Sequence, residues 1–198
     1  MTKKIIFPLF ALMCLAQWFV PGQMIYDQEQ VLREGKLYKF KTAPIDPSDP
    51  FRGKYITLNF EENEIGIVDP KEWEHAQDIY VSIVDSAGFA KISTVSMYEP
   101  EGADYIKAKV GYISYYEPFM LQIRYPFERF YLEESKASEA EQVYWNSRTD
   151  STTVIYAVVS VKDGDAALKD VMVNDRSIAE IVKEINDKKD KLNEDTSK

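Results

Sequence analysis

The chain has 198 residues, of which 45% are hydrophobic and 13% aromatic, and its 24 basic and 33 acidic residues give a net charge of −9. This composition indicates a folded protein with one core rather than a disordered chain. Lys3 and Lys4 are the only charges before Asp27, so the remaining body is more acidic still, which argues against nucleic acid as a partner. The only cysteine, Cys14, precedes the body, which excludes internal disulfides, thiol catalysis and a cysteine metal site there.

Residues 1–25 are predicted to form a membrane anchor. The stretch from Ile5 to Ile25 carries no charge and reaches the length of about 20 residues that a spanning helix needs. Lys3 and Lys4 on the short leading side predict a cytoplasmic N-terminus, a single pass through a bacterial inner membrane, and a periplasmic or otherwise extracytoplasmic body.

Other interpretations of the same segment are a cleaved signal peptide and a buried core helix. Cys14 and Ala16 are small enough to flank a cleavage site after Ala16. Lipoprotein processing at Cys14 is disfavoured because the bulky Met13 precedes it, and a core helix is disfavoured because the segment has no polar face. Cleavage of the anchor therefore stays open at this stage.

Residues 26–35 are predicted to form a short stalk helix that ends at Gly35. A strand is expected over 36–42, followed by a loop in which Pro44, Pro47 and Pro50 recur every third residue. This period matches polyproline II, which has three residues per turn, so a second set of side chains shares another edge of the loop. That set is Asp46, Asp49 and Arg52.

The residues from 36 to 186 are predicted to form one β-rich domain. In KYITLNF (54–60), Ile56, Leu58 and Phe60 alternate with polar residues, as in a half-buried strand. Further strands are expected over 64–68, 78–84, 89–96, 104–114, 119–125, 128–132, 152–162 and 166–173. Many short strands separated by polar turns favour a mainly β, antiparallel barrel or sandwich-like fold.

Two helices are expected within this domain. The first covers Ser135 to Tyr144, and the second is a short amphipathic C-terminal helix. A capping-box pattern of Ser177 and Glu180 begins the second helix. From 187 to 198 the sequence is charged on all sides and is expected to be a frayed tail.

Two blocks of this sequence, APIDPSDPFRGKYITLNF and RYPFERFYLEE (124–134), resemble the GDYXXLXY family of bacterial membrane-anchored proteins. Gly53, Tyr55, Leu58 and Phe60 fall on motif positions, whereas Lys54 replaces the motif's Asp and Phe60 its last Tyr. In the second block, Pro126 stands where the family tends to have Gly. The resemblance implies an anchor, a shared fold and a multi-spanning membrane protein as partner, but no reaction, because the family has no known function.

Two charged groups are candidates for binding. The two aspartates of the proline loop could hold a cation or act as an acid–base pair, although the loop lacks a calcium-loop pattern. The second group consists of charged residues around Arg124, which alternate with residues predicted to face inward. These charges could line a carboxylate- or peptide-binding groove, or they could form ordinary cross-strand ion pairs. The candidate binding residues are Asp46, Asp49, Arg52, Gly53, Tyr55, Arg124, Glu128 and Arg129.

The sequence assigns no catalytic residue, metal ligand or cofactor. His75 is the only histidine and is interpreted as a surface residue, so neither a multi-histidine zinc site nor a serine triad is expected. The leading hypothesis is an accessory or interaction domain that binds a membrane-protein or envelope partner. The alternatives are a carboxylate-dependent envelope hydrolase, using pairs such as Asp46 with Glu128 or Glu133, and a purely structural tether.

Overall fold

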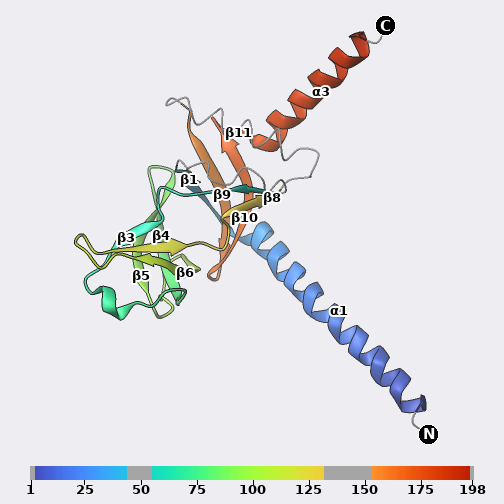
Figure 1. Ribbon diagram of the computed structural model, residues 1–198, viewed down its shortest axis with the longest axis horizontal. Helices are drawn as coiled ribbons and strands as arrows, with labels where there is room; N and C mark the ends of the chain where they lie inside the picture. The colour runs from blue at the N-terminus through green and yellow to red at the C-terminus, as the bar shows by residue number, and fades with distance from the viewer. Residues whose placement is uncertain (1–2, 44–54, 132–152, 197–198) are drawn as a thin grey trace.

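A computed structural model describes residues 3–43, 55–131 and 153–196 of the chain (Figure 1). The proline loop and the helix expected from Ser135 to Tyr144 lie outside the described residues. Figure 1 shows a β body from which two helices, one at each end of the chain, extend in different directions.

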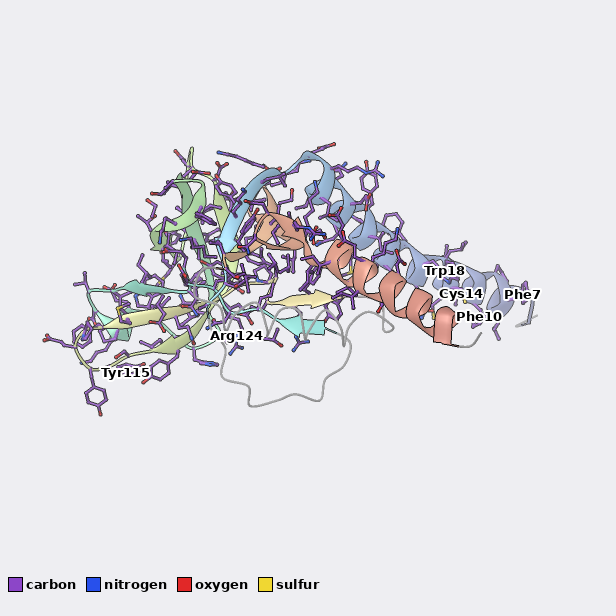
Figure 2. All side chains as sticks on the ribbon, turned by 90° about the horizontal axis from the view of Figure 1, so that it is seen from above. Phe7, Phe10, Cys14, Trp18, Tyr115 and Arg124 are labelled. Atoms are coloured by element: carbon purple, nitrogen blue, oxygen red, sulfur yellow. The ribbon has the colours of Figure 1, made fainter. Side chains whose placement is uncertain are left out.

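The N-terminal helix α1 (Lys3–Glu34) is 32 residues long and contains Pro8 and Pro21. Its part from Ile6 to Glu34 is long and apolar enough to cross a membrane. Figure 2 shows Phe7, Phe10 and Trp18 on this helix, away from the body. The residues predicted as a separate stalk continue the same helix, because strong helix formers and the Glu29–Arg33 ion pair, at 3.0 Å, follow the apolar segment directly.

The strands agree closely with the ranges expected from alternation. They are β1 (Lys36–Lys41), β2 (Tyr55–Thr57), β3 (Glu64–Gly66), β4 (Asp78–Ser86), β5 (Phe89–Ser96), β6 (Tyr105–Ile113), β7 (Met120–Arg124), β8 (Arg129–Tyr131), β9 (Ile155–Lys162), β10 (Asp165–Val173) and β11 (Arg176–Ser177). A short 3₁₀ helix, η1 (Pro70–Glu72), precedes β4. The described strands form sheets with the orders β3-β7-β6-β4-β5, β1-β9-β10-β11 and β2-β8.

The sheets curve into a nearly closed, barrel-like body. Paired strands run antiparallel, and a parallel bridge between Ile106 and Gly164 joins the two larger sheets. An antiparallel bridge between Thr42, which follows β1, and Phe60, which follows β2, links the chain beyond these two strands. The mainly β, antiparallel fold predicted from the sequence is therefore confirmed, and of the two forms left open, barrel and sandwich, the structure shows the barrel-like one.

Tight turns connect the longest hairpins. Ala87 and Gly88 between β4 and β5 have φ of 54° and 83°, and Asp163 and Gly164 between β9 and β10 have φ of 51° and 84°. Two successive residues with positive φ match the right-handed twist of the flanking strands, as in a type I′ turn.

The expected strand 54–60 is divided in the structure. After β2 ends at Thr57, the Leu58 N–H donates to the Glu128 carbonyl at 2.8 Å, and the Glu61 N–H donates to the Lys41 carbonyl at 3.0 Å. The chain therefore changes partner within a few residues and joins two parts of the barrel. Leu58 and Phe60 are both buried, as the alternation predicted.

The C-terminal helix α3 (Ile178–Thr196) begins where the capping pattern predicted. The Ala179 N–H donates to the Ser177 hydroxyl at 3.2 Å, and Ile178 and Val182 are fully buried against the sheet. The helix continues through residues 187–196, which were expected to fray, and the three lysines, the leucine and the glutamate of this segment favour a helix.

The end of α1 is fixed to β9. Val31 is buried, and the Ser160 hydroxyl, which has no exposed surface, donates to the Val31 carbonyl at 2.6 Å. Lys162 forms an ion pair with Glu34 at 2.5 Å, and a Cβ atom on Gly35 would collide with the Ser160 side chain. The helix and the body therefore meet at a packed junction that favours one orientation.

Candidate functional site

The two sequence blocks that carry the family resemblance meet in space. β2 pairs with β8, and Tyr55, Ile56 and Thr57 lie opposite Tyr131, Phe130 and Arg129, respectively. Because about 70 residues separate these strands in the sequence, only the tertiary structure brings them together. We call the paired strands β2 and β8, with the connecting residues 124–128, the motif ladder.

Four aromatic rings pack beneath the motif ladder. Phe40 from β1, Phe60, Tyr125 and Phe127 lie with ring centroids between 5.0 and 5.9 Å apart, mostly edge-to-face, and each ring is at most 3% exposed. Rings at these distances and angles attract one another beyond the burial of their apolar surface. The Tyr125 hydroxyl donates to the Glu62 carbonyl at 2.8 Å, so its polar end is satisfied. The motif residue Phe60 thus has a structural role.

Charged side chains lie on the outer side of the same segment. Arg124 is exposed at the end of β7, and Arg129 is exposed on β8, while Glu128 between them is half-buried. Partial removal from water raises the pKa of the Glu128 carboxyl. The positive charges of Arg124 and Arg129 and a backbone hydrogen bond with Tyr125 act in the opposite direction.

Arg124 lies next to other positive charge. Its cross-strand neighbour on β6 is Lys109, which forms an ion pair with Asp78 at 2.6 Å. Within the described ranges we find no ion pair of Arg124, so the interpretation as an ordinary cross-strand pair gains no support. An exposed guanidinium beside a half-buried carboxylate can bind a partner's carboxylate or backbone carbonyl groups.

The structure places only some of the predicted binding residues. Arg124, Glu128 and Arg129 lie close in the motif ladder, and Tyr55 pairs in register with Tyr131. The other four candidates are outside the described residues: Asp46, Asp49, Arg52 and Gly53.

In the described part of the chain, no group of three or more His, Cys, Asp or Glu side chains is arranged to hold a metal ion. His75 is exposed, as predicted from its charged surroundings.

Sequence reasoning missed a polar contact between the two larger sheets. Lys36 and Tyr38 on β1 both donate to the Asp104 carboxylate, at 2.7 and 2.6 Å, and these hydrogen bonds hold its pKa below the usual range. The partners are 68 and 66 residues apart in the chain, so no local spacing could have revealed the contact.

Sequence reasoning also missed an exposed aromatic group at the β6–β7 connection. Tyr112, Tyr115 and Tyr116 are 65%, 58% and 82% exposed. Figure 2 places Tyr115 at the end of the body far from α1. The run YISYYEP, with its aromatic residues next to a proline turn, was the available signal.

Comparison with known proteins gave one result. The model of a family described as GDYXXLXY protein matches residues 17–171, a range that includes the end of α1 and the body up to β10. No curated protein and no solved structure matches the chain.

Proposed function

Because the chain belongs to the GDYXXLXY protein family, we propose that it is a membrane-anchored accessory protein whose body binds a membrane-protein or envelope partner. The match covers the motif ladder and the end of the helix that can span a membrane. The proposed binding surface is the charged outer side of residues 124–131.

The proposed topology is a single pass through a bacterial inner membrane. Lys3 and Lys4 precede the apolar part of α1, and lysines near a membrane-spanning segment favour the cytoplasmic side. The body is then extracytoplasmic. The proposed anchor is uncleaved, because cleavage after Ala16 would leave only residues 17–25 of the uncharged stretch, too few to span a membrane.

The observation that carries the proposal is the pairing of β2 with β8. Both sequence blocks that carry the family resemblance contribute to one ladder, and no described group of three or more His, Cys, Asp or Glu side chains is arranged there to hold a metal ion. What it does present is an exposed Arg124 without a described ion pair, beside a half-buried Glu128. Exposed arginine next to aromatic residues is typical of protein-binding surfaces.

The test is co-purification of the tagged full-length protein from membranes in mild detergent. Arg124→Ala should reduce the recovery of an integral membrane or envelope partner, while Lys71→Ala, which removes one exposed positive charge from η1, should not. Thermal unfolding of both variants checks that the fold is intact. Equal recovery with Arg124→Ala and the parent would contradict the proposed surface.

A second candidate is a carboxylate-dependent hydrolase of the cell envelope. The half-buried Glu128, whose pKa is raised by burial, has the property that a general acid needs. If this function holds, Glu128→Gln abolishes hydrolysis of envelope polymers by the purified protein while the fold stays intact. Hydrolysis that is equal in the parent and in Glu128→Gln would rule out this role.

A further inference from the structure

The apolar part of α1 contains a polar side chain close to its middle. Gln17 lies two residues from Leu15, the centre of the uncharged stretch Ile5–Ile25, which corresponds to about 3 Å along the helix axis. The side chain of Gln17 is exposed, and we find no hydrogen bond from it within the described residues. In a membrane-spanning α1 this amide lies in the hydrocarbon core.

Pro21 leaves a second polar group, a backbone carbonyl, without a hydrogen-bond donor at the same place. Residue 21 lies inside α1, and a residue with a backbone N–H there would donate to the carbonyl of residue 17. Proline has no N–H, so the Gln17 carbonyl lacks its helical donor. The side-chain amide and the backbone carbonyl of one residue therefore both need hydrogen-bond partners.

Lipid chains cannot supply these partners. In a bilayer, unsatisfied polar groups are costly, and carbonyls released by proline are usually satisfied by neighbouring helices or by polar side chains. Glutamine in membrane helices hydrogen-bonds across helix–helix contacts for the same reason. The two groups of Gln17 thus indicate contact with another helix inside the membrane.

The helical phase of Gln17 shows on which side that helix lies. At 100° per residue, Phe10 and Met24 are within about 20° of Gln17 around the helix, and Val31 is within about 40°. Val31 is the residue that is buried against the body. Gln17 therefore faces the same side of α1 on which the body packs, and a helix bound to it lies beneath the body.

This direction disfavours a second copy of the chain. In a symmetric dimer each subunit presents the same face to the other. Because the body is fixed to α1 on the Gln17 side, two copies joined at Gln17 would both place a body in the space above the shared contact. A membrane helix from a protein without such a body on that side avoids this conflict.

We propose that Gln17 and Pro21 form a hydrogen-bonding site for a transmembrane helix of a different integral membrane protein, which lies beneath the β body. The helix contributes a side chain that donates to the Gln17 carbonyl or amide oxygen, such as serine, threonine, asparagine or glutamine. The inference rests on the proposed membrane anchoring and specifies the partner as one that is bound within the membrane as well as by the body.

The test uses photo-cross-linking of the full-length protein in membranes. A benzophenone amino acid replaces Phe10, on the Gln17 side, or Phe19, about 160° away from Gln17. Both replaced residues are apolar aromatic side chains that are exposed on α1. We expect cross-links to one integral membrane protein from position 10 and not from position 19.

Substitutions test the hydrogen bond itself. Gln17→Leu should lower the yield of this cross-link and of the co-purified partner by about threefold to tenfold, as expected for loss of one interhelical hydrogen bond. The matched control Gln23→Leu makes the same chemical change about 120° around the helix and should leave both yields unchanged.

Three results would overturn the inference: equal cross-linking from both positions, cross-linking only to a second copy of the chain, or equal partner recovery with Gln17→Leu and the parent. If the partner is recovered but is insensitive to Gln17→Leu, this inference fails while the proposed function stands. If the parent recovers no membrane partner at all, both fail.

Discussion

Phe60→Ala should strongly destabilise the body. Phe60 is 2% exposed, and its ring lies 5.7, 5.9 and 5.4 Å from the rings of Phe40, Tyr125 and Phe127. Replacing a buried phenylalanine by alanine removes the transfer free energy of the ring and leaves a cavity, at a cost of about 3–5 kcal/mol. Since a domain is stable by only about 5–15 kcal/mol, this one side chain accounts for a large part of the margin.

The measurement is thermal unfolding of the full-length protein in detergent, followed by near-ultraviolet circular dichroism. This signal comes mainly from aromatic side chains in packed surroundings, which the body supplies, since the aromatic residues of α1 such as Trp18 are exposed, whereas the far-ultraviolet signal contains the whole of α1. For a body of this size, about 1 kcal/mol corresponds to about 2–4 °C, so the midpoint should fall by roughly 6–20 °C.

Tyr116→Ala is the matched control, because it also removes an aromatic ring but from a side chain that is 82% exposed. Its effect should stay within about 0.5 kcal/mol, as for most surface substitutions. If Phe60→Ala lowers the midpoint no more than Tyr116→Ala does, the aromatic rings beneath the motif ladder do not stabilise it as we argue.

Three further predictions concern a charge, a turn and the helix junction. Burial raises the pKa of Glu128 in the folded protein, so the folded state becomes less stable relative to the unfolded state as the pH rises above about 4.3, where the unfolded carboxyl loses its proton. Glu128→Gln should therefore raise the unfolding midpoint at pH 7 but not at pH 4. Equal shifts at both pH values would contradict this. Gly164→Ala should lower the free energy of unfolding more than Gly88→Ala does. Both glycines have φ near +84°, but only at Gly164 would an added Cβ meet the ring of a β6 tyrosine. Equal urea midpoints of the two variants would refute this reasoning. Ser160→Ala should cost about 1 kcal/mol in urea unfolding by removing the hydrogen bond to the Val31 carbonyl, and an unchanged midpoint would show that packing alone holds the junction.

The candidate site was predictable in part. Alternation over the expected strand 119–125 placed Arg124 on the face opposite to the inward residues, and the structure shows Arg124 exposed, because successive side chains of a strand point to opposite faces. The half-burial of Glu128 was not predictable, since it depends on how residues 124–128 cross from β7 to β8. Its raised pKa follows from that tertiary environment alone.

By itself the sequence determined the elements of this protein. Period-two alternation and the polar turns between the alternating runs placed the strands, the uncharged run predicted the apolar part of α1, and the Ser177 cap predicted the start of α3. These features depend on interactions between residues close together in the chain, and local propensities therefore reveal them.

Only the tertiary structure decided which elements meet. The pairing of β2 with β8, the contact of Lys36 with Asp104 and the docking of Val31 against Ser160 join residues that are far apart in the chain. Each such contact forms because the hydrophobic core brings distant segments together. The pattern of polar and apolar residues within either segment does not reveal its partner. The division of the expected strand at Thr57 has the same cause, since the residues after it donate hydrogen bonds to Glu128, just before β8, and to Lys41 on β1.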